Sequence, residues 1–189
     1  MDLVIDVQFC KDANDKNVPK EVAVLALNKD FSSHWMVLPP YTIKKLPSKV
    51  RCQNNWLMQN HHGFTWLDGD ISQRTLLKNL ESISRYTNKI YVRGHEKLVF
   101  LQGVVHNEVI NLEDDENCPS FENLSSTGKY CLQHGIKSPY LSFHCAMNNV
   151  GKLKFWLNQR KALENNNIEI LLSLENIDNE QLGNFTNNS

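Results

Sequence analysis

Three short segments near the start of the chain have the pattern of β-strands and are separated only by short polar turns. Residues 2–10 alternate apolar and polar side chains, residues 21–27 form an apolar run, and residues 34–38 stop at a pair of prolines. Turns this short join strands that run in opposite directions. The sequence therefore predicts an antiparallel three-stranded meander.

After the meander, apolar side chains recur at helical spacing and alternate with shorter strand-like runs. Helices are predicted over residues 47–60, 72–85, 95–103 and 148–164. Strands are predicted over residues 89–94 and 109–112. Ser72 is a suitable N-cap for the second helix. Three strands, two helices and then strand–helix–strand–helix predict an α/β fold in which helices cover a mixed sheet.

The length of 189 residues suits one domain, which we predict over residues 1–160. The polar, Asn-rich residues 161–189 are predicted to form a loosely packed or disordered tail. No apolar run approaches the ~20 residues that span a membrane, and the first residues lack a secretory signal. We therefore expect a cytoplasmic or nuclear protein whose five cysteines stay reduced.

Cysteine and histidine gather in one part of the sequence. Cys131 and His134 form a Cys-x-x-His pair, Cys145 follows eleven residues after the histidine, and Cys118 lies thirteen residues before Cys131. Sulfur and imidazole are preferred zinc ligands, and four of them make a closed structural site. Residues 119–143 lack a regular apolar pattern, so a metal would fix a loop that is otherwise long for a compact domain. The alternative is that these cysteines are small buried apolar residues.

A short basic segment is a second candidate site, because the formal net charge of −1 gives no overall attraction to nucleic acid. Its cations lie near Tyr41 and Trp56, and they are Lys44, Lys45, Lys49 and Arg51. Basic side chains beside aromatic ones are typical of single-strand binding, although a solvated helix face has the same composition. The adjacent His61 and His62 are interpreted as surface residues of a loop.

The element order and several local motifs resemble the DnaQ-like (RNase H-type) exonucleases. The resemblance covers roughly residues 2–157, and its motifs lie at residues 5–8, 47–65, 76–80, 91–101 and 144–150. Enzymes of this family use four carboxylates to hold two divalent ions, with a histidine as general base. The resemblance therefore implies an RNase H-like fold and marks the residues that stand at the catalytic positions.

Only part of that catalytic set is present. Asp6 and His144 match the family, whereas Gln8, Lys97 and Asn149 stand where it has carboxylates. One carboxylate beside a lysine gives a formal charge near zero, and Mg²⁺ or Mn²⁺ needs anionic oxygen ligands. We therefore predict a degenerate site that does not hold two metal ions.

A second resemblance concerns the metal ligands. Residues 18–22, the Cys-x-x-His pair and the His-Cys-Ala of residues 144–146 resemble the Maelstrom domain, a DnaQ-like fold of animal small-RNA silencing. That family lacks the usual catalytic carboxylates and binds zinc through a Glu-Cys-His-Cys set, which implies Glu21 as the fourth ligand here. Ligand chemistry alone favours Cys118 instead, so the fourth ligand stays open between these two residues.

These observations lead to three functional hypotheses. The preferred one is a catalytically degenerate nuclease fold that binds single-stranded RNA or a protein partner, in RNA silencing or mobile-element biology. The first alternative is an active metal-dependent 3′–5′ exonuclease with a non-standard ligand set. The second alternative is a protein-interaction scaffold without a nucleic-acid role, which the near-neutral charge favours.

Overall fold

The computed structural model describes residues 1–125, 131, 133–134 and 144–185, and for residues 166–185 it describes the backbone alone. Part of the predicted loop over 119–143 therefore lies outside the described residues. The described chain divides into two compact units, Met1–Lys154 and Phe155–Ser189. The first unit contains the sheet and both candidate sites.

A five-stranded mixed sheet forms the centre of the first unit. Its strands are β1 (Leu3–Lys11), β2 (Asn17–Ala26), β3 (Ser32–Met36), β4 (Lys89–Val92) and β5 (Glu108–Asn111), in the spatial order β3-β2-β1-β4-β5. β1, β2 and β3 pair antiparallel, so the predicted meander is confirmed. β4 runs parallel to both β1 and β5, which makes the sheet mixed as the sequence indicated.

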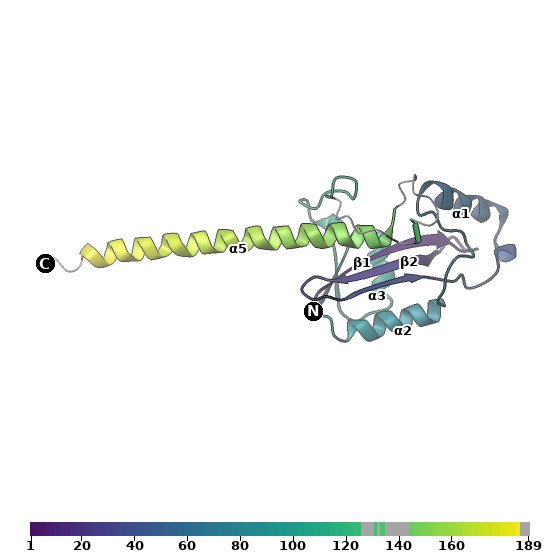
Figure 1. The fold of residues 1–189 in the computed structure, drawn as a ribbon, viewed down its shortest axis with the longest axis horizontal. Helices are drawn as coiled ribbons and strands as arrows, with labels where there is room; N and C mark the ends of the chain where they lie inside the picture. Colours follow the sequence, from purple (N-terminus) through teal and green to yellow (C-terminus); the bar gives the residue numbers. More distant parts are fainter. Residues whose placement is uncertain (126–130, 132, 135–143, 186–189) are drawn as a thin grey trace. The chain divides into compact units, whose positions relative to one another are not determined.

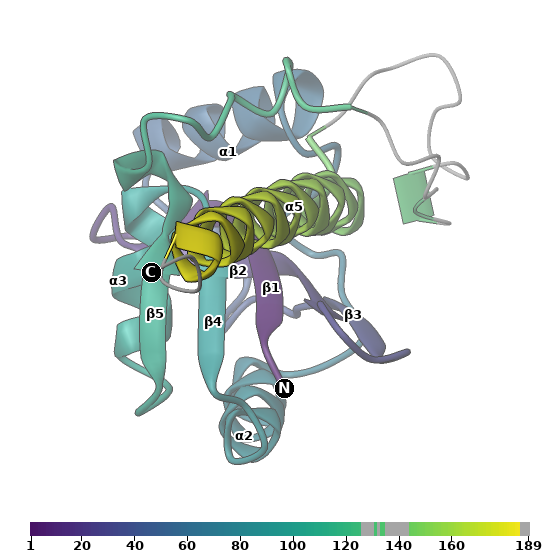
Figure 2. The same ribbon diagram turned by 90° about the vertical axis from the view of Figure 1, so that its left-hand side faces the viewer.

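Helices cover both faces of this sheet. They are α1 (Ser48–Asn60), α2 (Gln73–Ser84), α3 (His95–Gln102) and α5 (Ala146–Phe185), with short 3-10 helices η1 (Ile43–Lys45) and η2 (Leu112–Asp114). Helices α1 and α2 lie on opposite sides of the sheet (Figure 1, Figure 2). The Ser72 side chain accepts a hydrogen bond from the Thr75 amide, so the predicted N-cap of α2 is confirmed.

The two faces of β1 differ in chemistry. Its odd-numbered residues Leu3, Ile5 and Val7 pack with Leu76 and Leu80 of α2 in the main apolar core. Its even-numbered residues on the opposite face include two buried polar side chains, Asp6 and Gln8. The strand is therefore buried on both faces, and the second face carries buried polar groups.

Helix α5 is longer than the sequence predicted. The apolar spacing indicated a helix that ends at Glu164, whereas the backbone of α5 continues to Phe185. Residues 161–185 contain no proline and are rich in Leu, Ile and Glu, which have good or moderate helix propensity. Local propensity therefore extends a helix that the spacing of apolar residues did not reveal.

Candidate metal centre and adjoining cleft

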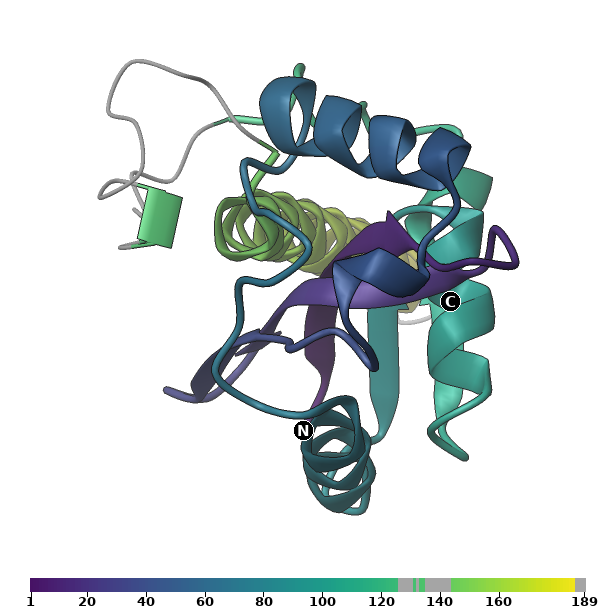
Figure 3. The same cartoon turned by 90° about the vertical axis from the view of Figure 1, so that its right-hand side faces the viewer.

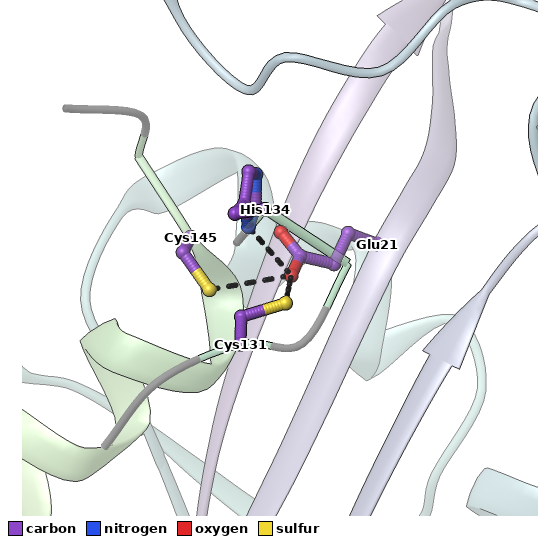
Figure 4. A group of neighbouring side chains, drawn as sticks. All are labelled: Glu21, Cys131, His134 and Cys145. Carbon is purple, nitrogen blue, oxygen red and sulfur yellow. Dashed lines mark hydrogen bonds and ion pairs between the residues drawn. The ribbon is translucent and has the colours of Figure 1, made fainter. Parts of the chain in front are cut away.

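Four side chains from distant parts of the sequence meet at one point beside β2. Glu21, Cys131, His134 and Cys145 each offer a ligand atom, and these atoms all lie within 4.8 Å of one another. Figure 4 shows the two sulfur atoms and the imidazole directed at the Glu21 carboxylate. Oε1 of Glu21 lies 3.5 Å from Sγ of Cys145, 3.8 Å from Sγ of Cys131 and 3.9 Å from Nδ1 of His134.

Glu21 is fixed by hydrogen bonds as well as by the strand. Its side chain is fully buried, Oε2 accepts from the amide of Ala146 at 2.9 Å, and Nε2 of His34 lies 2.8 Å from Oε1. Burial raises the pKa of Glu21, and the hydrogen bonds from His34 and Ala146 act in the opposite direction. A buried carboxyl group is costly unless charge or hydrogen bonds compensate it, and a bound cation would provide such compensation.

The other three side chains are arranged as metal ligands usually are. Nε2 of His134 donates to the carbonyl oxygen of His62 at 2.7 Å, which leaves the lone pair on Nδ1, the atom nearer Glu21. Metal-bound histidines commonly donate their second ring N–H to such an acceptor. The Cys145 thiol donates to Cys131 and lowers the pKa of Cys131, which favours a thiolate there. The four groups can therefore hold a metal ion.

Cys118, the alternative fourth ligand, lies outside this group. Its Sγ is 3.8 Å from the carbonyl oxygen of Pro119, and burial raises the pKa of its thiol. The structure thus brings Glu21, and not Cys118, to Cys131, His134 and Cys145.

On the same face of the sheet, Asp6 is surrounded by hydrogen-bond donors. Asp6 is fully buried; Nζ of Lys97 lies 2.5 Å from Oδ1, and the side-chain amides of Gln8 and Asn149 each donate to Oδ2 at 2.9 Å. The three residues that stand at the expected carboxylate positions all bind the remaining carboxylate. This donor set does not fit two hard dications, because its one anionic group is already neutralised.

A cleft of about 340 Å³ lies beside Asp6. Its lining includes Phe9, His61, Arg93, Lys97, Phe121 and His144. The Lys97 ammonium group lies 5.0 Å from the centroid of the Phe121 ring, and the Arg93 guanidinium group lies 5.6 Å from it. Sequence reasoning missed Arg93 and Phe121, although Arg93 directly follows a strand parallel to its neighbours, and this is a common place for ligand contacts.

The interpretation of His61 and His62 as surface residues is wrong for His62. His62 is fully buried; its Nδ1 accepts from the Phe64 amide at 3.1 Å, and its Nε2 lies 3.7 Å from Sγ of Cys10. Burial, together with the neighbouring His61, lowers the pKa of His62 to about 3. His61 lines the cleft, and its ring stacks on His144 with centroids 4.4 Å apart. Neither position has a local pattern that indicates burial.

The predicted basic segment lies on η1 and α1, and each of its cations is exposed. Lys44 and Lys45 belong to η1, and Lys49 and Arg51 belong to the first half of α1. These four side chains do not line the cleft, but Leu57 of the same helix does.

Comparisons of the chain with known protein families, with curated proteins and with solved structures found no match. Within the described residues, no helix has the length and apolar character needed to cross a membrane.

Proposed function

We propose that this chain is a DnaQ-like, RNase H-type domain that has lost its two-metal centre and binds single-stranded RNA in the cleft beside Asp6. The observation that carries the proposal is the arrangement of Gln8, Lys97 and Asn149, which all donate to Asp6. The order of strands and helices also agrees with that of the family that the sequence resembles. Such a cleft can still bind a nucleic-acid strand, but without the two metal ions it cannot hydrolyse phosphodiester bonds by the mechanism of that family.

The metal centre is proposed to hold one zinc ion in a structural role. Two sulfurs, one imidazole and one carboxylate oxygen are ligands that zinc accepts, and four protein ligands leave no position for water or substrate. With both thiols ionised and Glu21 charged, the ligands carry −3 against the +2 of zinc, so the ion would offset most of the buried charge. Hard cations such as Mg²⁺ prefer oxygen ligands, so two sulfurs disfavour them.

The cleft has features that suit an unpaired nucleotide strand. Phe9 and Phe121 offer aromatic surface. The Arg93 and Lys97 side chains lie at the Phe121 ring, where Arg93 pairs with Glu113 and Lys97 pairs with Asp6. Stacking of bases on aromatic rings next to basic groups is the usual basis of single-strand binding without sequence preference. The cleft volume lies within the ~300–1,000 Å³ range of small-ligand sites.

Binding and digestion of a labelled oligonucleotide test the proposal. Fluorescence anisotropy at low salt should detect binding of single-stranded RNA by the zinc-loaded full chain without Mg²⁺ or Mn²⁺. Phe121→Ala should weaken this binding about tenfold, since loss of one stacking contact costs about 1–3 kcal/mol. Tyr86→Ala is the matched control, because Tyr86 is 75% exposed and outside the cleft lining.

Two outcomes would contradict this function. Digestion of the strand with Mn²⁺ that disappears in Asp6→Ala would establish the exonuclease alternative. Absence of binding at low salt, where phosphate contacts are strongest, would leave the protein-interaction scaffold.

A further inference from the structure

A stretch of the chain without acidic residues surrounds helix α1. Residues 31–67 contain no Asp or Glu, although the whole chain has a formal net charge of −1. The same stretch carries four cations, Lys44, Lys45, Lys49 and Arg51. The excess positive charge of this region is therefore local and attracts a polyanion to α1.

Helix α1 is held with one defined face toward solvent. Val50 packs in a small apolar cluster with Cys10, and Asn54 is buried between α1 and β1. The Asn54 side chain accepts from the amide of Lys11 and donates to its carbonyl oxygen, both at 2.8 Å. These contacts fix the rotation of α1 about its own axis. Figure 3 shows this helix lying over one face of the sheet.

The outward face carries a stripe of exposed side chains that ends in a tryptophan. Lys49, Gln53, Trp56 and Asn60 follow one another at spacings of four, three and four residues, which places them along one side of a helix, and all are exposed. The Trp56 side chain is 58% exposed. An indole exposed to this extent beside basic side chains is suited to stacking on a nucleobase.

The stripe, defined as Lys49, Gln53, Trp56 and Asn60, adjoins residues that line the cleft. Leu57 follows Trp56 in sequence and lines the cleft, and His61 follows Asn60 and lines it too. A helix rises about 1.5 Å per residue, so Lys49 stands about 10 Å from Trp56 along the axis. A strand that leaves the cleft at Leu57 would therefore meet the indole first and Lys49 next.

Glu96 and Glu113 line the cleft itself, and the turn between β1 and β2 is a further source of acidic groups. The turn contains Asp12 and Asp15, but Lys11 and Lys16 flank them. The Asp12 carboxylate accepts from the amides of Asn14 and Lys16 at 2.8 Å each. This turn is electrically balanced and does not cancel the charge of α1.

We propose that α1 is a second binding surface for single-stranded nucleic acid, on which Trp56 stacks a base and Lys49 binds a phosphate. This inference rests on the proposed function, because it extends the strand from the cleft. An oligonucleotide of about two or three nucleotides is then expected to engage the cleft alone, whereas one of about twelve is long enough to reach α1 as well.

The test compares these two lengths of single-stranded RNA by fluorescence anisotropy. Trp56→Ala should weaken binding of the twelve-nucleotide strand about tenfold and leave the short strand unchanged. Lys49→Ala should reduce the slope of log affinity against log salt for the long strand by about 0.7, the value expected for one phosphate contact. Tyr86→Ala, another exposed aromatic residue, should change neither measurement.

Tryptophan fluorescence gives an independent reading. The long strand should quench the tryptophan emission of the wild type. Trp56→Phe should remove the part of this quenching that comes from Trp56. Equal affinities of wild type and Trp56→Ala for the long strand, with no quenching assigned to Trp56, would overturn the inference while the cleft proposal stands. If the wild type binds neither the short nor the long strand, the cleft proposal and the α1 proposal are both overturned.

Discussion

Replacing Lys97 with methionine keeps most of the side-chain volume and removes the charge. Lys97 is 8% exposed in its side chain, Asp6 is fully buried, and their charged atoms lie 2.5 Å apart. Removing one partner of a buried ion pair costs about 3–5 kcal/mol, because the other charge stays buried. The amides of Gln8 and Asn149 would still donate to Asp6 but bring no positive charge.

We therefore expect Lys97→Met to lower the free energy of unfolding by about 3–5 kcal/mol. For a chain of this size one kcal/mol corresponds to about 2–4 °C, so the melting temperature should fall by about 6–20 °C. Urea and thermal unfolding, followed by circular dichroism at saturating zinc, measure both quantities. Lys89→Met is the matched control, because Lys89 and Glu108 form a surface pair at 3.5 Å with side chains 49% and 61% exposed. A pair of this kind contributes about 0–1 kcal/mol.

A double variant separates the ion pair from simple loss of packing. Asp6→Asn with Lys97→Met removes both charges, and its destabilisation should fall short of the sum of the single effects by at least about 0.5 kcal/mol. The reasoning is refuted if Lys97→Met costs no more than Lys89→Met, or if the two single effects add within error.

Three further predictions concern the cysteines and the buried histidine. The purified protein should contain one zinc ion per chain by elemental analysis, and Cys131→Ser should lose this ion whereas Cys118→Ser should retain it. The pKa of about 3 for His62 lies below its ordinary value of about 6.5, so only the unfolded chain takes up a proton at this ring as the pH falls from about 6.5 toward 3. The stability that the neutral ring provides is present above about pH 6.5 and is lost through that window. The unfolding free energy of the wild type should therefore fall more steeply than that of His62→Gln, by up to about 1.4 kcal/mol per pH unit in urea titrations, and parallel curves would contradict this. Burial raises the pKa of Cys10 to about 11, so iodoacetamide at neutral pH should alkylate the exposed Cys52 and spare Cys10, as mass spectrometry of the folded protein would show.

The sequence predicted the features that depend on neighbouring residues. The meander follows from short turns between strand-like runs, and the start of α2 follows from the Ser72 side chain, which satisfies a free amide of the first turn. Contacts between residues far apart in the sequence could not be predicted from local patterns. The Asp6–Lys97 contact joins two residues 91 positions apart, and only the resemblance to a family placed both residues at one site.

The fourth metal ligand illustrates the same limit. Thiolate is a better zinc ligand than carboxylate, so ligand chemistry favoured Cys118. The Cys118 thiol, however, lies outside the group of four ligands and contacts the carbonyl oxygen of Pro119. Glu21 occupies the position because β2 delivers it, 110 residues before Cys131 in sequence. The burial of His62 was missed for a related reason, since its apolar environment comes from elements that are distant in sequence.

The metal centre and the cleft are mechanically connected through the same two elements. Glu21 pairs across the β1–β2 ladder with Gln8, which binds Asp6. The backbone amide of Asn149 donates to the carbonyl oxygen of Cys145, and the Asn149 side chain donates to Asp6. A metal ion that holds Glu21 to Cys145 therefore fixes the distance between β2 and the start of α5, and with it the spacing of the donors around Asp6. Because this spacing keeps a buried carboxylate neutralised, a metal ion bound at Glu21 and Cys145 would also stabilise the donor set around Asp6.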